Sequence, residues 1–306
     1  FLGSDLERIY DELGKRFPEI CFVRCFMDPI MRKSGLTPDQ KLRLSMYDPL
    51  KKGTVTEEGQ RRISILGSDF ALDETSDLKR LLRCNDYQIK ESPVCESWED
   101  YLSLSDCRMM LNCYPSGKAG TEWAAERLGR PFMYLPSCFD YDEIKEEIRS
   151  LIKELQAGWS LENVSNTECA DITSEEIEVF YQREITLCED SINHARSIIG
   201  DTPIVLDYLY HPGPLGLAKL LLEHGFHVTT VYLDSISPEE KPAFDWLKLH
   251  HPDLELRATI QTKMRVLPRG TEGKVLAIGQ KAAWFTGSRH FVNMVQGGGL
   301  WGFDGI

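Results

Sequence analysis

The chain has 306 residues and a formal net charge of −13, and its length favours two or three domains of roughly 100 to 150 residues each. The acidic balance excludes binding to a nucleic-acid backbone, which needs clustered Lys and Arg side chains that this sequence lacks. Because no apolar run approaches the roughly 20 residues of a membrane helix and no signal peptide opens the sequence, we expect a cytoplasmic protein that does not enter a membrane.

The first 55 residues predict a helix, a strand and a second helix. Ser4 begins a capping box that starts the first helix. An apolar, β-branched run over residues 20–26 predicts a strand, and Thr37 caps a second helix over residues 38–47. We interpret residues 1–55 as the remnant of a first α/β domain.

Strands and helices alternate through residues 56–155, which predicts a second α/β domain with a parallel, helix-covered sheet. The predicted strands cover residues 62–66, 87–90, 109–111 and 131–136, and the predicted helices cover residues 76–82, 97–102, 119–128 and 141–155. A helical connection then occupies residues 156–200, with its helix over residues 174–199.

Residues 201–306 predict a third α/β domain, truncated at its C-terminus. Its predicted strands cover residues 203–209, 226–233, 274–279 and 290–295, and its longer helices cover residues 215–224 and 243–250. The fold class expected for the whole chain is therefore α/β, with multiple Rossmann-like domains and parallel, helix-covered sheets.

The cysteines predict free thiols and no local metal site. Their number, nine, is odd and their spacing irregular, which argues against a disulfide framework. Cys21 and Cys25 would lie about 13 Å apart at the rise of a strand, too far to share one metal ion. Cys107 and Cys113 fail the same test, so any metal ion bound here takes its ligands from distant parts of the chain or from another chain.

Cys113 stands where the strand of residues 109–111 passes into the helix of residues 119–128. Ligands of open α/β sheets gather at the carboxyl ends of strands, and a following helix N-terminus favours the thiolate that binds metals. Cys113 is therefore a candidate metal ligand. The alternative is a buried thiol that packs as a small hydrophobic residue.

Two other features lie in the third domain. Gly297, Gly298 and Gly299 follow a strand, and three successive glycines let backbone N–H groups approach a ligand or form an anion nest; a flexible turn is the alternative. His211 follows the first strand, where a ligand or a packing group is expected. The glycines of the chain do not form the G-x-G-x-x-G pattern, so we expect no NAD or FAD.

Five segments, in this order, are similar to motifs of one family. They read FLGSDLE from Phe1, LNCYPS from Leu111, GRP from Gly129, GQK from Gly279 and QGGGLWGFDG from Gln296. Together they resemble the nitrogenase component-one type oxidoreductases, which include nitrogenase molybdenum–iron protein subunits, their cofactor scaffolds and protochlorophyllide reductase subunits. In that family a cluster-binding cysteine directly precedes the first segment, and this sequence begins after that position. The resemblance therefore implies a fragment that is inactive by itself.

The resemblance assigns roles to residues already singled out. It implies that Cys113 ligates a metallocluster and that Lys281 faces the cofactor together with the backbone of Gly297, Gly298 and Gly299. Val292 or Asn293 stands where nitrogenase has its cofactor histidine, and His211 lies in the loop that carries arginines there. These departures favour a scaffold-like or different reductase site over a nitrogen-reducing cofactor.

The resemblance also implies a function and partners. The chain is expected to hold an iron–sulfur or related metallocluster, or a reducible substrate, between α/β domains. Electrons would come from an ATP-dependent iron–sulfur reductase, and a sister component-one subunit or a second copy would complete a dimer or heterotetramer. The alternative is a non-catalytic cofactor scaffold or small-ligand-binding module of the same architecture.

Overall fold

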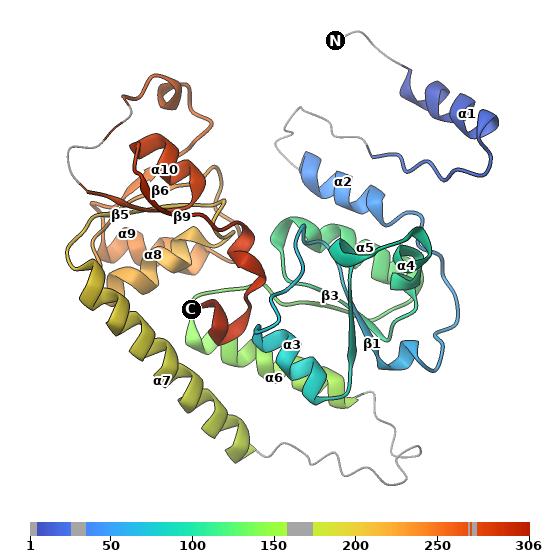
Figure 1. Cartoon of the computed structure of the whole chain (residues 1–306), viewed down its shortest axis with the longest axis horizontal. Coiled ribbons are helices and arrows are strands. Elements are labelled where there is room, and N and C mark those ends of the chain that lie inside the picture. Colours follow the sequence, from blue (N-terminus) through green and yellow to red (C-terminus); the bar gives the residue numbers. More distant parts are fainter. Residues whose placement is uncertain (1–4, 26–34, 158–173, 269, 271–273) are drawn as a thin grey trace. The chain divides into compact units, whose positions relative to one another are not determined.

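The computed structural model describes residues 5–25, 35–157, 174–268, 270 and 274–306. The chain divides into two compact units (Figure 1). Unit 1 consists of Phe1–Ala71 and Leu82–Pro136, and unit 2 consists of Leu72–Leu81 and Ser137–Ile306. The domain boundaries predicted at residues 55, 155 and 200 stay predictions.

Unit 1 contains a four-stranded parallel sheet. The strands are β1 (Arg62–Ile65), β2 (Gln88–Glu91), β3 (Met109–Asn112) and β4 (Phe132–Tyr134), in the spatial order β2-β1-β3-β4. All four residues of β3 are buried, as expected for a strand covered on both faces. Because β1 and β3 are neighbours and their connections run to opposite sides, the switch point of this sheet lies between their carboxyl ends.

Helices α2 (Pro38–Met46), α4 (Trp98–Leu102) and α5 (Lys118–Leu128) accompany this sheet, and α1 (Leu6–Arg16) precedes them. Thr37 caps α2 through a reciprocal capping box with Gln40, as predicted. The core gathers buried apolar residues of α5 and β3, of the segments after α2 and β1, and of the segment between α4 and β3: Tyr47, Leu50, Leu66, Leu104, Cys107, Met110, Ala124, Ala125 and Leu128.

Two predictions for the N-terminal region differ from the structure. Residues 20–25 form no strand, because they pair with no neighbouring strand within the described residues and a single strand cannot satisfy its backbone groups; Phe26 lies outside those residues. The cap of the first helix lies one residue later than predicted, at Asp5, whose side chain accepts a hydrogen bond from the Arg8 N–H at 3.1 Å. Ser4 itself lies outside the described residues.

Unit 2 contains a five-stranded parallel sheet of β5 (Ile204–Asp207), β6 (Val228–Tyr232), β7 (Glu255–Arg257), β8 (Leu276–Ile278) and β9 (His290–Val292). The order is β7-β6-β5-β8-β9, which puts the switch point between β5 and β8. The sequence did not predict β7, whose residues are exposed or half-buried at the sheet edge and give no apolar run. β9 ends at Val292 and not at the predicted residue 295.

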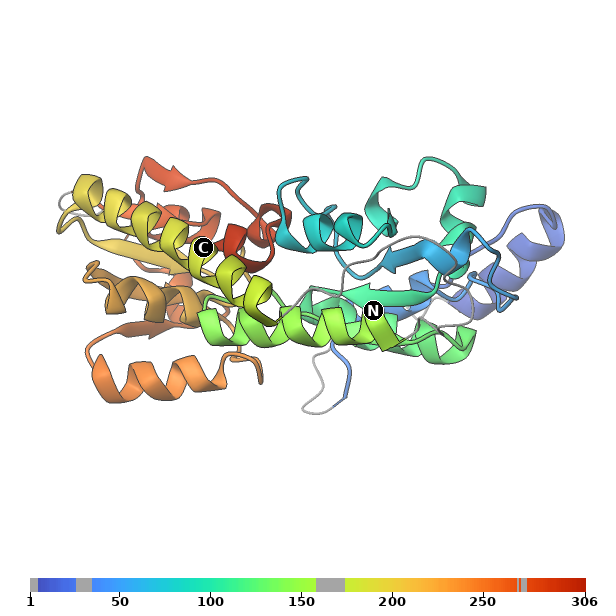
Figure 2. The same cartoon turned by 90° about the horizontal axis from the view of Figure 1, so that it is seen from below.

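Helices cover both faces of this sheet. Figure 1 shows α10 (Gln280–Thr286) on one side of the strands and α8 (Pro214–Glu223) and α9 (Lys241–His250) on the other. The main core of the unit joins α8 to β5 and β6. The long helix α7 (Ser174–Ile199) is unbroken in both views (Figure 2), and α6 (Tyr141–Ala157) and the first residues of α3 (Asp77–Cys84) belong to the same unit.

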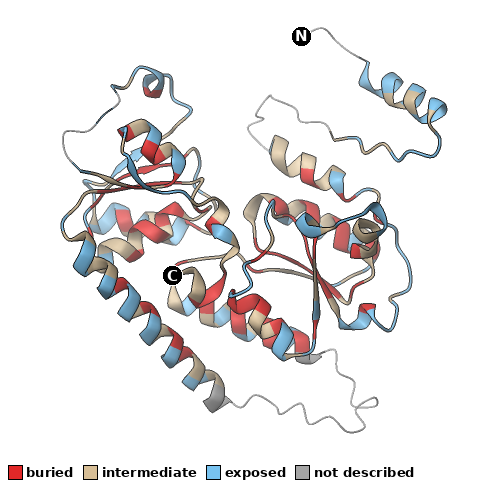
Figure 3. Cartoon of the chain, in the orientation of Figure 1, coloured by how far each residue is buried: buried red, intermediate tan, exposed pale blue. Residues whose placement is uncertain are grey.

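Burial follows this layering. Figure 3 shows buried residues along the strands and on one side of the covering helices, whereas none of the residues of α1 is buried. In the described part of the chain, no helix is both long and apolar enough to cross a membrane. Both sheets are parallel and flanked by helices, which confirms the predicted α/β fold class.

Candidate functional site

Cys113 lies directly after β3 in unit 1, at the carboxyl end of the most buried strand of the sheet. Its side chain is buried, with 8% of its surface exposed. The preceding Asn112 is fully buried, and its Nδ2 donates a hydrogen bond to the Leu66 carbonyl at 2.7 Å. Asn112 therefore ties the end of β3 to the residue that follows β1, which holds Cys113 at the switch point.

Two glycines bring the loops after β1 and β3 into direct contact. A Cβ atom at Gly117 would lie 2.4 Å from the Gly67 Cα atom, and a Cβ at Gly67 would lie 2.7 Å from the Gly117 Cα. Gly67 also has a φ of +88°, which favours glycine. Side chains at these positions would separate the loops, so the chain needs glycine at both.

Two polar atoms near Cys113 lack a hydrogen-bond partner in the part of the chain that the structure describes. The Oδ1 atom of Asn112 and the Oγ atom of Ser116 are buried and have no hydrogen-bond partner among the described residues. Buried polar atoms are normally paired, so an unpaired acceptor and an unpaired hydroxyl at one strand end point to a missing bonding group. The end of β3 thus offers one thiol and two polar atoms to a ligand.

In unit 2, Asp207 at the end of β5 organises the loops at the second switch point. It is 1% exposed, and its Oδ1 atom accepts hydrogen bonds from the N–H groups of Leu209 at 2.7 Å and Tyr210 at 3.3 Å. Its Oδ2 atom accepts one from the Ala282 N–H at 2.6 Å, in the first turn of α10. One carboxylate therefore fixes both the loop that carries His211 and the start of α10.

His211 and the glycine turn meet, as the sequence alone could not show. The Gly297 N–H donates to the Tyr210 carbonyl at 2.6 Å, and a Cβ at Gly297 would lie 2.8 Å from the His211 Cδ2 atom. Gly297, Gly298 and Gly299 all have positive φ angles of 63° to 78°. Glycine at 297 thus allows the imidazole to pack against the turn.

The protonation of His211 follows from its contacts. Its Nδ1 atom accepts a hydrogen bond from the Gly213 N–H at 2.9 Å, and complete burial lowers the pKa of the imidazole to about 3. The ring is therefore neutral with its proton on Nε2, and Nε2 has no hydrogen-bond partner in the part of the chain described. A metal-ligating histidine usually donates its other N–H. Here that nitrogen accepts, so His211 is arranged as a hydrogen-bond donor and not as a metal ligand.

Glu240 occupies the N-terminus of α8, beside His211. Its Oε1 atom accepts hydrogen bonds from the N–H groups of Leu215 at 2.6 Å and Gly216 at 3.1 Å. The side chain is 5% exposed, and burial raises the pKa of this carboxyl to about 7, against the lowering effect of the two hydrogen bonds. The carboxyl accepts hydrogen bonds from N–H groups in the first turn of α8, which have no partner within the helix. A protein group therefore already occupies the N-terminus of α8.

Lys281 and Asn293 make contacts of their own. Lys281 Nζ donates to the Tyr208 hydroxyl and, at 3.3 Å, to Thr259 Oγ1, and it lies 3.9 Å from an Asp234 oxygen. Asn293 is exposed, and its Oδ1 accepts a hydrogen bond from Gln280 Nε2 at 2.8 Å. The structure thus joins His211 to the glycine turn in unit 2, while Cys113 belongs to unit 1.

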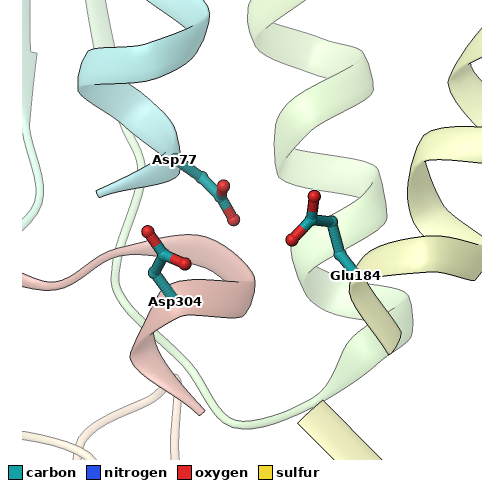
Figure 4. A group of neighbouring side chains, drawn as sticks. All are labelled: Asp77, Glu184 and Asp304. Carbon is teal, nitrogen blue, oxygen red and sulfur yellow. The ribbon is translucent and has the colours of Figure 1, made fainter. Parts of the chain in front are cut away.

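A group of carboxylates that the sequence did not predict lies elsewhere in unit 2. Figure 4 shows Asp77 of α3, Glu184 of α7 and Asp304 near the C-terminus pointing toward one another, with carboxylate oxygens within 4.8 Å. The Asp77 Oδ2 atom accepts a hydrogen bond from the Phe303 N–H at 2.7 Å. Burial raises the pKa of Asp77 to about 6, against the lowering effect of Arg80.

Arg80 already supplies positive charge to this group. Its Nη2 atom pairs with Asp77 Oδ1 and lies 3.4 Å from Glu184 Oε1. The carboxylates and Arg80 therefore form a network that docks the C-terminal segment against α3 and α7, and we assign it no ligand. Its members come from three distant parts of the chain, so no local motif could reveal it.

Comparison with known proteins locates the fold. No protein-family model and no curated protein sequence matches the chain. The structure of nitrogenase Cp1 at pH 6.5 aligns with a TM-score of 0.56 and 13% identity, over 95% of this chain and 65% of that chain. Nitrogenase Cp1 at pH 5 aligns with a TM-score of 0.50 and 13% identity, over 92% of this chain and 60% of that chain. The fold resembles that of nitrogenase.

This likeness confirms the nitrogenase-like architecture that the motifs implied, at the level of the fold. The chain spans 65% and 60% of the length of these two neighbours. Within the nitrogenase-like fold, sequence reasoning selected Cys113, His211 and the three glycines from strand ends and missed Glu240. Glu240 directly precedes α9 in the sequence, which gives no sign that its side chain caps a different helix, α8.

Proposed function

We propose that the chain is part of a nitrogenase-like oxidoreductase subunit of the component-one type, which holds a metallocluster or a reducible substrate. The observation that carries the proposal is the likeness to nitrogenase Cp1 over 95% of the chain. Because 13% identity supports the fold alone, the chemistry is argued from the residues at the two switch points.

The end of β3 fits a bound group with one thiolate ligand. Cys113 offers the thiol, and the unpaired Asn112 Oδ1 and Ser116 Oγ atoms offer hydrogen bonds to groups on the ligand. An iron–sulfur or related metallocluster, when bound, supplies reversible storage of single electrons. The residues of this chain would fix its position through Cys113 and exclude water, since that thiol is buried.

The residues of unit 2 fit the recognition of anionic groups. His211 would donate from Nε2, and the backbone of Gly297, Gly298 and Gly299 would allow close approach, because these positions carry no side chain. Lys281 would add positive charge, which Asp234 at 3.9 Å partly balances, and Asn293 would add an amide. Electrons would come from an ATP-dependent iron–sulfur reductase, with a sister subunit or a second copy completing the oligomer.

Anaerobic purification of the full-length protein, followed by iron analysis and an electronic spectrum, tests the proposal. We expect iron and charge-transfer absorption, both lost in Cys113→Ala. Cys107→Ala is the matched control, because Cys107 is also a buried thiol of unit 1 but packs in the core. A protein without iron, or equal iron in both variants, would contradict the proposal.

A cofactor scaffold is the second candidate, favoured by the tautomer of His211. Because His211 is arranged as a donor and not as a metal ligand, Cys113 would be the one proposed protein ligand, and a cluster held by one thiolate is more easily released. A cluster that passes to an acceptor protein but takes up no electrons from the reductase partner would support the scaffold and refute the reductase.

A further inference from the structure

A pocket in unit 1 is walled by side chains from three parts of the chain. Its volume is about 480 Å³, and small-molecule sites typically occupy about 300 to 1,000 Å³. Val23 comes from the segment after α1, Met46 from the end of α2, and Trp98 and Tyr101 from α4. The lining includes neither Cys113 nor any residue of unit 2, so the pocket is separate from the two sites described above.

Trp98 and Tyr101 form one flat wall of this pocket. Their rings stack with centroids 5.6 Å apart and an angle of 11° between their planes. The Tyr101 hydroxyl donates a hydrogen bond to the Met46 carbonyl, which fastens the wall to the end of α2. Trp98 is 41% exposed, so its ring is accessible to a ligand. An indole ring packs against apolar groups and attracts cations through the negative charge on its face.

Glu96 gives the pocket a negative charge. Among the lining residues it is the one whose side chain is ordinarily ionised, and no cation in the described part of the chain pairs with its carboxylate. The nearby cations already have partners. Arg24 turns toward α1, where it pairs with Glu7 at 2.5 Å and Asp11 at 3.1 Å, and Lys90 pairs with a carboxylate of α4. The charge of Glu96 is therefore left unbalanced.

The remaining polar groups of the lining are neutral. The Ser97 hydroxyl accepts a backbone hydrogen bond at 3.0 Å as the cap of α4, and the Ser92 side chain forms a hydrogen bond with the Tyr47 hydroxyl. Burial raises the pKa of Cys25 and of Cys95, so both thiols stay protonated near pH 7. The lining thus presents no positive charge that would oppose a cation.

We propose that this pocket binds a small organic cation, an ammonium group carried on an apolar or aromatic body. The body packs against Trp98, Val23 and Met46, and the ammonium group lies beside the Glu96 carboxylate. Binding involves no covalent step. A neutral molecule of the same shape gains only the packing, and an anion meets the charge of Glu96 without a cationic partner.

Isothermal titration of the chain with phenethylamine, a cation at pH 7, tests the proposal. The probes 2-phenylethanol and phenylacetate have a similar size and are neutral and anionic. We expect one phenethylammonium ion per chain, bound about fivefold more tightly than 2-phenylethanol, as an exposed ion pair allows. Phenylacetate should bind more weakly than either. Raising the ionic strength to about 1 M should weaken binding of the cation and leave that of 2-phenylethanol unchanged, because salt screens an exposed ion pair.

Two pairs of variants locate the site. Glu96→Gln should lower the affinity for phenethylamine about fivefold and leave that for 2-phenylethanol unchanged. Its control Glu99→Gln removes an exposed charge of α4 outside the lining and should bind like the parent protein. Trp98→Leu should weaken binding of the cation by about tenfold, whereas Trp284→Leu alters an exposed tryptophan of unit 2 and should change nothing.

The comparison of probes on the parent protein keeps the proposal testable if a variant fails to fold. Equal affinity for the three probes, tighter binding of phenylacetate than of phenethylamine, or no saturable binding of phenethylamine would overturn the proposal. Equal affinity of Glu96→Gln and the parent protein for phenethylamine would also overturn it. Cys113→Ala should bind phenethylamine like the parent protein, since Cys113 does not line the pocket.

Discussion

Glu240→Gln tests the electrostatics of the cap on α8. The glutamine amide oxygen keeps the two hydrogen bonds from Leu215 and Gly216, whereas the negative charge is removed. Burial penalises the negative charge and thereby raises the pKa of Glu240 from its ordinary value of 4.5 to about 7. The substitution therefore separates the cost of the buried charge from the benefit of the cap.

The sign of the effect follows from the raised pKa. The pKa of Glu240 is higher in the folded protein, about 7, than its ordinary value of 4.5. Its contribution to stability is therefore fully present below pH 4.5 and is lost as the pH rises through about 7. The difference between these two pKa values corresponds to about 3 kcal/mol. The free energy of unfolding of Glu240→Gln should equal that of the parent protein below pH 4.5 and exceed it by up to about 3 kcal/mol above pH 7.

Urea unfolding followed by circular dichroism at several pH values measures this difference. Glu223→Gln is the matched control, because Glu223 is exposed at the opposite end of α8. In Glu240→Ala the two N–H groups lose their acceptor, and we expect a loss of about 1 to 2 kcal/mol below pH 4.5. If Glu240→Gln follows the same pH profile as the parent protein, the buried charge does not act as argued.

Two further predictions use the same assay. Burial raises the pKa of Asp77 from 3.8 to about 6, so stability should fall by about 3 kcal/mol as the pH rises through this interval; Asp77→Asn should remove that slope, whereas the exposed control Asp142→Asn should keep it. Gly297→Ala places a Cβ 2.8 Å from the His211 ring, whereas Gly200 has a similar φ of +58° and no atom within 4 Å. Gly297→Ala should therefore cost about 1 to 3 kcal/mol more than Gly200→Ala, and equal losses would show that the ring can move aside.

Local sequence signals located most helices and strands because short-range physics decides them. β3 is an apolar run that is buried on both faces, and Thr37 caps α2 through neighbours three residues away. Sequence patterns gave wrong predictions where a strand depends on a neighbouring strand that is distant in the sequence. Residues 20–25 have strand-forming side chains but pair with no strand in the described part of the chain, and β7 forms at a sheet edge from residues that give no apolar pattern.

The candidate site divides in the same way. Strand ends and successive glycines were readable, so Cys113, His211 and Gly297 could be selected before the fold was known. The direction of the His211 hydrogen bonds was not readable, because it depends on the Gly213 N–H and on complete burial. The sequence left His211 as a ligand or a packing group, and the hydrogen bond from Gly213 favours a hydrogen-bond donor over a metal ligand.

The sequence by itself determined the fold class, most of the helices and strands, and the polar residues that follow the strands, since these depend on side chains close together along the chain. Only the tertiary structure decided which distant groups meet: Glu240 on the end of α8, and Asp77 beside the Phe303 N–H. These long-range contacts result from packing, which brings residues together by shape and burial and produces no periodic pattern in the sequence.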